Sequence, residues 1–300
     1  MDRRELLKVL SAGAVGTLWA GGALAQRTMP VRAIPGTDET LPIVGLGSTR
    51  PVTEIAELGA ARVEAIIRAL VDIGGRVVDT WPRNADNDAA LGEIIDARDL
   101  RDRLFVTINL AQPDPQAGIA DFQSTLSRYR RDTIDLVNVG SLIGLDAQWP
   151  NLRAFKDAGQ ARYIGVTAAQ AELYDTLESF LGREQPDFVE INYSVTERDA
   201  ERLLPMLADR GIAVLISRPF MNGAYFERLE GRPLPAWTAE FECESWAQFS
   251  LQYILANPDL TCVLTETTNP LHMAENAATA LKPLPDAAAR ARMRALIDGL

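Results

Sequence analysis

The sequence predicts an α/β fold, a closed (β/α)8 TIM barrel of eight parallel strands, on three observations. Short β-rich apolar runs alternate with helix-length segments eight times along the chain. These runs recur mostly at spacings of roughly 25–35 residues, which is typical of parallel strands joined by helices. A chain of 300 residues is long enough for one such barrel. An open, doubly wound sheet is the alternative, weakened because no Gly-x-Gly-x-x-Gly turn follows the first strand.

The predicted strands are, in chain order, 43–45, 76–79, 104–109, 133–137, 163–166, 188–191, 213–216 and 261–264. A polar, proline-bearing lead, residues 26–41, precedes them. Apolar residues recur at helical spacing between the strands, as in Val63, Ile66, Ile67 and Leu70 and in Leu203, Leu204 and Leu207. Gly159 and Gly211 stand where helices should end, just before the fifth and seventh strands. The interval 220–242 is longer than an ordinary connection, so it is either a binding loop or a passive insertion.

The first twenty-five residues are typical of an export signal. Arg3, Arg4 and Lys8 precede an apolar run that is diluted by Gly and Ser and ends at Ala25. The adjacent arginines resemble the twin-arginine motif, so we expect cleavage after Ala25 and a folded barrel domain, residues 26–300, in the periplasm. An uncleaved anchor is the alternative. Because this route exports folded proteins, the export machinery is a partner and any cofactor would travel bound.

Composition excludes several functional classes. A net charge of −11, with 41 acidic against 30 basic residues, disfavours nucleic acid and anionic lipid as partners. One histidine and two cysteines exclude a multi-histidine metal site and a disulfide scaffold, so no metal site and no metal-dependent hydrolase is expected. We expect Cys243 and Cys262 to be buried free thiols, with a bridge between them as the alternative.

The active face of such a barrel is the carboxyl end of its strands. The residues to inspect there are Asp79, Asn84, Asn109, Gly140, Thr167, Glu190, Ser217, Arg218 and 266–272. Trp81 and Arg83 are expected to project over the same mouth, where they either hold a ligand or plug the opening.

Several segments, in this order and spacing, resemble the aldo/keto reductases. They are Leu41-Pro-Ile-Val-Gly-Leu-Gly47, Val78-Asp-Thr-Trp-Pro82, Ala90-Leu-Gly92, Thr133-Ile-Asp-Leu136, Leu152-Arg-Ala-Phe-Lys-Asp-Ala-Gly159, Tyr163-Ile-Gly-Val166, Gly211-Ile-Ala-Val214 and Asn269-Pro-Leu-His-Met-Ala-Glu-Asn276. The resemblance covers nearly the whole predicted mature chain. It implies a (β/α)8 barrel and, by ancestry, carbonyl reduction with a nicotinamide cofactor.

The catalytic residues that this resemblance implies are mostly replaced. The family uses a tyrosine as proton donor, a lysine that lowers its pKa, an aspartate that pairs with the lysine, and a histidine that orients the carbonyl. The aspartate is present as Asp79, whereas the tyrosine, lysine and histidine positions read Asn84, Asn109 and Gly140. An amide neither releases a proton near neutral pH nor lowers a neighbour's pKa by charge, so the usual mechanism lacks its acid.

The cofactor positions implied by the resemblance have changed as well. The pair that contacts the nicotinamide amide reads Thr167-Ala168, the sixth-strand glutamine reads Glu190, and the stacking aromatic reads Ser217, followed by Arg218. Glu266, Thr267 and His272 stand near the site of the 2′-phosphate, where a carboxylate repels phosphate and disfavours NADP(H) against NAD(H). Glu275 and Asn276 remain at the positions that contact adenine.

Each candidate also has a purely structural interpretation. Asp79 can hold the turn at its strand end, and His272 can be a surface residue early in the last helix. Arg218 can bind an anion in the mouth or form an ion pair with Asp79 or Glu190. Asn84 and Asn109 can bind a polar ligand or fill a closed pocket.

Two hypotheses for function follow. The first is an exported homologue that has lost the usual carbonyl reduction and binds a small-molecule ligand or a periplasmic protein. The second is an NAD(P)-dependent oxidoreductase with a tightly bound cofactor and a relocated proton donor: Glu190, Tyr193 or Tyr225, of which Glu190 is best placed by strand position.

Overall fold

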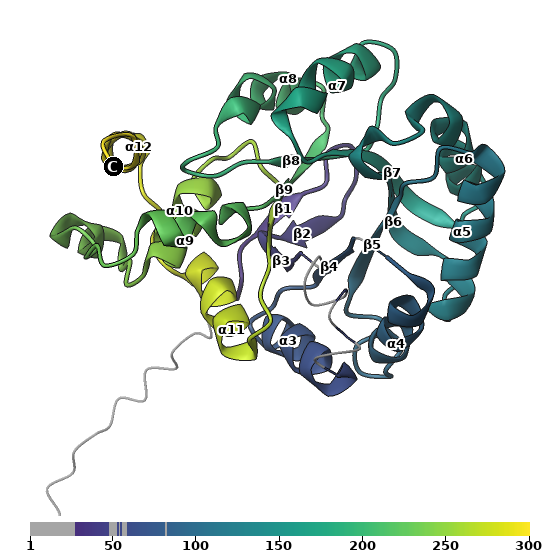
Figure 1. Ribbon diagram of the computed structural model, residues 1–300, viewed down its shortest axis with the longest axis horizontal. Coiled ribbons are helices and arrows are strands. Elements are labelled where there is room, and N and C mark those ends of the chain that lie inside the picture. The colour runs from purple at the N-terminus through teal and green to yellow at the C-terminus, as the bar shows by residue number, and fades with distance from the viewer. Residues whose placement is uncertain (1–27, 48–52, 54, 56–58, 82) are drawn as a thin grey trace, which may run out of the picture.

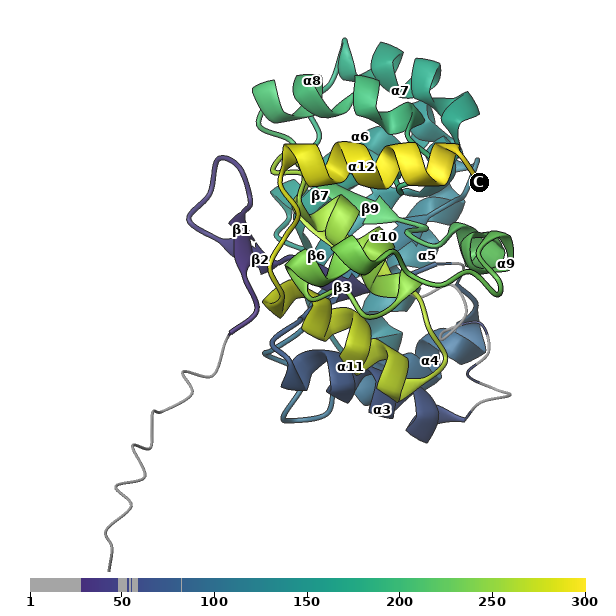
Figure 2. The same ribbon diagram turned by 90° about the vertical axis from the view of Figure 1, so that its left-hand side faces the viewer.

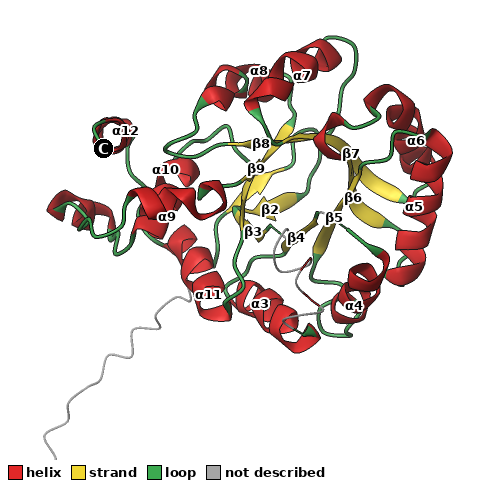
Figure 3. Ribbon diagram, viewed as in Figure 1, coloured by secondary structure: helices red, strands yellow, loops and turns green. Residues whose placement is uncertain are grey.

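The structure is a computed structural model that describes residues 28–47, 53, 55, 59–81 and 83–300. Eight parallel strands close into a barrel in the order β10-β3-β4-β5-β6-β7-β8-β9, and helices surround it (Figures 1 and 3). The predicted (β/α)8 barrel is therefore confirmed. The predicted export signal lies outside the described residues. Within the part of the chain described here, no helix has the length and apolar character needed to cross a membrane.

Each predicted strand overlaps a strand of the barrel. These are β3 (Val44–Leu46), β4 (Val77–Thr80), β5 (Phe105–Leu110), β6 (Ile134–Val139), β7 (Ala161–Ala168), β8 (Phe188–Asn192), β9 (Ala213–Ser217) and β10 (Cys262–Thr265). The largest difference is β7, which is eight residues long because Ala161 also pairs with Ile134 of β6.

The helices of the described chain fill the intervals between strands. The α-helices are α3 (Ala60–Asp72), α4 (Ala85–Ile95), α5 (Pro115–Arg128), α6 (Leu145–Asp157), α7 (Tyr174–Leu181), α8 (Leu204–Asp209), α9 (Ala224–Arg228), α10 (Trp246–Leu255), α11 (Pro270–Ala278) and α12 (Ala287–Asp298). Short 3-10 turns are η1 (Gly140–Leu142), η2 (Ala171–Leu173), η3 (Asp199–Arg202), η4 (Met221–Gly223), η5 (Ala236–Phe241) and η6 (Thr279–Leu281).

Two predictions about helices are confirmed: the apolar stripe between residues 63 and 70, and the helix ends at Gly159 and Gly211. Val63, Ile66, Ile67 and Leu70 form the buried stripe of α3. Gly159 and Gly211 have φ of +72° and +64°, the left-handed conformation that ends a helix.

The prediction that His272 lies in the last helix is wrong. Its helix, α11, is followed by α12 beyond a segment that contains Pro283 and Pro285. The interval 220–242 carries η4, α9 and η5. Cys243 and Cys262 are buried free thiols, so the bridge is absent.

The proline-bearing lead contains an antiparallel hairpin, which the sequence analysis did not predict. β1 (Val31–Ala33) pairs with β2 (Thr40–Pro42) at the amino end of the barrel. Figure 2 shows the hairpin at one end of the molecule and α9 at the other. Ile34 and Leu41 of this segment belong to the apolar cluster inside the barrel, so the hairpin closes that end.

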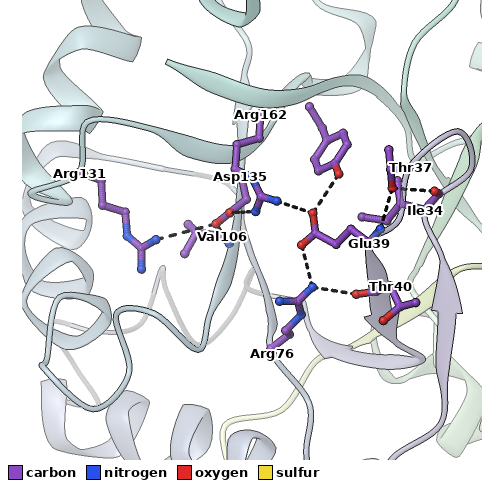
Figure 4. Close-up of polar contacts among 10 residues, drawn as sticks. Ile34, Thr37, Glu39, Thr40, Arg76, Val106, Arg131, Asp135 and Arg162 are labelled. Atoms are coloured by element: carbon purple, nitrogen blue, oxygen red, sulfur yellow. Dashed lines mark hydrogen bonds and ion pairs between the residues drawn. The ribbon is translucent and has the colours of Figure 1, made fainter. Parts of the chain in front are cut away.

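A polar network fastens the hairpin to the barrel (Figure 4). The Glu39 carboxylate accepts hydrogen bonds from Arg76, at 2.9 Å, from the hydroxyl of Tyr163, at 2.9 Å, and from Arg162. Arg162 also donates to Asp135 at 2.6 Å. Since the hairpin and these charged groups cover the amino end of the described barrel, we expect a site at its carboxyl end.

Candidate functional site

A cavity of about 330 Å³ opens at the carboxyl end of the barrel strands. It is lined by Gly47, Asp79, Trp81, Asn109, Ser141, Thr167, Ala169, Gln170, Glu190, Ser217, Arg218, Asn222, Leu264 and Glu266. Side chains along a strand point alternately into and out of the barrel. In β4, β5, β7 and β8 the first inward side chain is apolar, and the inward side chains nearer the mouth are polar. We call this space the mouth cavity.

Four predicted site residues form one hydrogen-bonded row across the floor of the mouth cavity. Oδ1 of Asp79 accepts from Nδ2 of Asn109 at 2.9 Å and also from the hydroxyl of Thr107. Oδ1 of Asn109 accepts from the hydroxyl of Thr167 at 2.6 Å. That hydroxyl lies 3.5 Å from Oε2 of Glu190. The row therefore links two carboxyl groups through one amide and one hydroxyl.

Burial disfavours the ionised form of both carboxyl groups in the row. Asp79 is 4% exposed and Glu190 is 5% exposed. Burial raises the pKa of Asp79 to about 6, against the opposing hydrogen bonds from Thr107 and Asn109. Burial and the neighbouring Asp79 carboxylate raise the pKa of Glu190 well above its ordinary value. Within the described chain, no basic side chain lies within 4.0 Å of either carboxylate, so the row has no ion pair.

The expected ion pair of Arg218 with Asp79 or Glu190 is absent from the described residues. Nη1 of Arg218 donates instead to the carbonyl of Ala169 at 3.3 Å, and its buried Nε has no hydrogen-bond partner. The backbone of Arg218 has φ of +53°, a left-handed turn directly after β9 that sets the direction of this side chain. Ser217 donates to Oδ1 of Asn192 at 3.2 Å.

Asn192, which the sequence analysis missed, supports the mouth cavity through hydrogen bonds with Ala169 and Ser217 but does not line it. Its Nδ2 donates to the carbonyl of Ala169 at 2.5 Å and thereby ties β8 to the loop after β7. The alternation of strand side chains could have found it, because Asn192 lies two residues after Glu190 and so faces the same way.

Asn109, Asn84 and Gly140, the positions predicted to correspond to the family's lysine, tyrosine and histidine, have different surroundings. Asn109 belongs to the hydrogen-bonded row, as described above. Asn84 is exposed and caps α4, accepting a hydrogen bond from the backbone N–H of Asn87 at 2.9 Å, and it does not line the mouth cavity. At Gly140 a Cβ would lie 3.2 Å from Cζ3 of Trp81 and 3.2 Å from Cβ of Asn109. Trp81 therefore takes the space that a side chain at position 140 would need.

Three other residues expected at the mouth lie elsewhere. Arg83 turns between α4 and α5, where Nη2 donates to Asp121 at 2.6 Å. Tyr193 is fully buried beneath α12 and donates to Glu201 at 2.8 Å, while Tyr225 donates to the carbonyl of Trp246 at 3.0 Å. Neither tyrosine lines the mouth cavity, so among the three suggested proton donors Glu190 alone lies in it.

A second cavity, of about 490 Å³, adjoins the mouth cavity at Glu266. It is lined by Phe220, Phe226, Ser245, Trp246, Ala247, Glu266, Thr267, His272, Glu275 and Asn276. The structure thus brings the predicted residues Thr267, His272, Glu275 and Asn276 together. Its described lining is aromatic on one side and contains two carboxylates, with no lysine or arginine. In the described chain, no three His, Cys, Asp or Glu side chains gather as a metal site.

Comparisons with known proteins agree with this architecture. The model of the aldo/keto reductase family matches residues 44–296. An aldo-keto reductase of Mycolicibacterium smegmatis is 33% identical over 149 residues, which are 47% of this chain and 50% of that protein. The chain thus spans about half the length of the curated relatives it matches.

Solved structures share the fold. The holo form of the aldo-keto reductase AKR11C1 from Bacillus halodurans superposes with a TM-score of 0.74 at 18% identity, covering 89% of this chain and 96% of its own. An aldo-keto reductase from Klebsiella pneumoniae in complex with NADPH has a TM-score of 0.71 at 18% identity, covering 87% and 93%.

Proposed function

We propose that this chain, which belongs to the aldo/keto reductase family, binds a small-molecule ligand at its barrel mouth and no longer reduces carbonyls by the family's usual mechanism. The single observation that carries this proposal is the hydrogen bond of 2.9 Å from Asn109 to Asp79. By resemblance a lysine belongs at position 109, and its charge would neutralise the aspartate and lower the pKa of a tyrosine. A neutral amide does neither.

The other two replacements support the same proposal. Asn84, at the tyrosine position, uses its side chain to cap α4. Gly140, at the histidine position, faces the ring of Trp81. The mouth cavity remains large enough for a small molecule of a few heavy atoms and offers it carboxyl, amide and hydroxyl groups.

A nicotinamide cofactor fits the adjoining cavities in part. Phe220, Phe226 and Trp246 offer an aromatic wall to an adenine ring, and Asn276 offers it an amide. Thr167 and Ser217 would hold the nicotinamide amide. Glu266 and Glu275, with no lysine or arginine in the described lining, oppose a 2′-phosphate. We therefore infer that NAD(H) binds better than NADP(H) if the chain carries a dinucleotide, unlike the Klebsiella pneumoniae neighbour with its NADPH.

One observation favours an alternative, an NAD(P)-dependent oxidoreductase with a relocated proton donor. Glu190 lines the mouth cavity, and burial with the nearby Asp79 carboxylate raises its pKa well above the ordinary value. A carboxyl group that stays protonated near neutral pH can give its proton to a carbonyl oxygen. A bound nicotinamide cofactor would supply the hydride, and Glu190 would recover its proton from solvent.

We further propose that residues 1–25 are a twin-arginine signal and that residues 26–300 act in the periplasm. Arg3 and Arg4, followed by the apolar run that ends at Ala25, support this proposal. Export in the folded state would let a bound ligand or cofactor travel with the protein. Fractionation of cells that express the full chain, compared with an Arg3→Lys, Arg4→Lys variant, tests it. Cytoplasmic retention of the unchanged protein would contradict it.

The experiment for the main proposal is a reductase assay with the exported protein. We expect no oxidation of NADH or NADPH with 4-nitrobenzaldehyde above the rate of the Asp79→Ala variant. A rate that Asp79→Ala abolishes would overturn the proposal, and a rate that Glu190→Gln also abolishes would establish the alternative. Native mass spectrometry of the exported protein then identifies the small molecule that co-purifies. Thermal denaturation with NAD(H) and NADP(H) measures which dinucleotide stabilises the fold.

A further inference from the structure

A third cavity, of about 340 Å³, lies on the other side of Trp81 from the mouth cavity. Trp81 and Asn109 line both, and the remaining walls come from the start of α4, the loop after β5 and the facing side of α5. These further lining residues are Arg83, Asn84, Ala85, Asp88, Ala111, Gln112, Asp121 and Arg128. Asn84 and Ala85 are exposed at its rim, so solutes reach it from solvent. We call it the arginine cavity.

Arg83 brings unused hydrogen-bond donors to the arginine cavity. Its side chain is 4% exposed, and Nη2 donates to Asp121 at 2.6 Å. Nε lies 3.9 Å from Asp88, beyond hydrogen-bonding distance, and neither Nε nor Nη1 has a hydrogen-bond partner. A buried donor without an acceptor is costly, and a guanidinium group offers its donors as a planar fork. Nε and Nη1 lie on different edges of the guanidinium plane, so a carboxylate in the arginine cavity would pair one of them with the second N–H of Nη2.

Arg128 adds a second guanidinium group to the same cavity. In the described part of the chain, no acidic side chain forms an ion pair with Arg128. The two carboxylates of the cavity are already engaged, because Asp121 accepts from Arg83 and Asp88 accepts from the hydroxyl of Tyr129 at 3.1 Å. The two arginines thus retain donors that no carboxylate of the cavity fills.

We propose that the arginine cavity binds the carboxylate group of a small organic acid, held by Arg83 and Arg128. A carboxylate matches the planar fork of a guanidinium group with two parallel hydrogen bonds. Asp88 and Asp121 stand beside the site, so a group with two negative charges, such as phosphate, is repelled more strongly than one with a single charge. The site involves no reduction and no cofactor, so it goes beyond the function proposed above and can fail or hold independently of it.

The experiment observes Arg83 directly by NMR. The Nε–H signals of the arginines are recorded in ¹⁵N-labelled exported protein, and that of Arg83 is assigned by its loss in Arg83→Lys. Sodium acetate and sodium phosphate are then titrated at constant ionic strength against sodium chloride. We expect a saturable shift of the Arg83 signal with acetate, a weaker one with phosphate and none with chloride.

Variants decide whether the two arginines bind the anion together. We expect Arg128→Gln to weaken acetate binding at least about tenfold, because it removes one of the two guanidinium groups without breaking an ion pair. The matched control is Arg130→Gln, since Arg130 follows the same helix but is 57% exposed, pairs with Glu93 and does not line the cavity. We expect it to bind acetate as the unchanged protein does.

Three results would overturn the proposal. The first is an Arg83 signal that shifts linearly with the concentration of every anion and never saturates, which indicates that there is no specific site. The second is an Arg128→Gln variant that binds acetate as tightly as the unchanged protein does and has the same midpoint of urea denaturation, so that its fold is intact. The third is tighter binding of phosphate than of acetate, which would assign the site to a dianion instead.

Discussion

The side-chain amide of Asn109 donates a hydrogen bond of 2.9 Å to Oδ1 of Asp79 inside the barrel mouth. This bond satisfies the aspartate without neutralising its charge, which leaves two buried carboxyl groups, Asp79 and Glu190, in one row. Two such groups cannot both ionise easily without a neighbouring positive charge, so ionisation of one carboxyl group favours the protonated form of the other.

Placing a lysine at position 109 should reverse this electrostatic effect. We expect Asn109→Lys to lower the pKa of Asp79 from about 6 by roughly one pH unit or more, because an ammonium group would stand beside the carboxylate. Carboxyl ¹³C NMR titration, with the Asp79 signal assigned by Asp79→Asn, measures the change. Asn84→Lys is the control, since position 84 is exposed and outside the mouth cavity. An equal shift in both variants would contradict the direct contact.

The pair of carboxyl groups should make stability fall as pH rises. Their pKa values are raised in the folded protein, so between the unfolded and folded pKa values the folded state holds protons that the unfolded state has lost. The contribution of this pair to stability is therefore full below about pH 4 and is lost as pH rises through 6 and above. We expect Glu190→Gln to be more stable than the unchanged protein by about 1–3 kcal/mol at pH 8, measured by urea denaturation.

The same measurement at about pH 4 is the internal control for Glu190→Gln, because Glu190 is then protonated in the folded unchanged protein and the amide replaces a group that is already neutral. The two proteins should have nearly equal stability there. A stability gain of the same size at both pH values would mean that packing, and not ionisation, is responsible.

The close packing of Gly140 against Trp81 predicts a measurable coupling. A Cβ at position 140 would lie 3.2 Å from Cζ3 of Trp81. We expect Gly140→Ala to cost about 1 kcal/mol of stability and Trp81→Phe to recover part of it, because a smaller ring leaves room. A double-mutant cycle by urea denaturation measures the coupling. Independent, additive effects would show that Trp81 does not fill this space.

The hairpin at the amino end should depend on Glu39. Glu39→Gln keeps the shape but removes the charge that accepts from Arg76, Arg162 and Tyr163. We expect a loss of about 1–2 kcal/mol, limited because the two arginines are partly exposed to water. Urea denaturation measures the loss, and faster tryptic cleavage after Arg32 locates it in the hairpin. Asp38→Asn, an exposed neighbour in the same turn, is the control and should leave both unchanged.

Much of the site was predictable, because the alternation of side chains along a strand determines which residues at the strand end point into the barrel. Asp79, Asn109, Thr167 and Glu190 each follow an apolar strand pattern, and the structure brings all four to one floor. Arg83 was misplaced by the same reasoning. It comes after the strand, where alternation ends, and its partner Asp121 is 38 residues away in the sequence.

The sequence by itself determined the barrel and its eight strands, because periodic burial and local turns are encoded within a few neighbouring residues. Only the tertiary structure decided that Asn84 caps a helix, that Trp81 covers Gly140 and that a hairpin seals the amino end. These features depend on contacts such as Glu39 with Tyr163, which are 124 residues apart and come together only when the barrel closes.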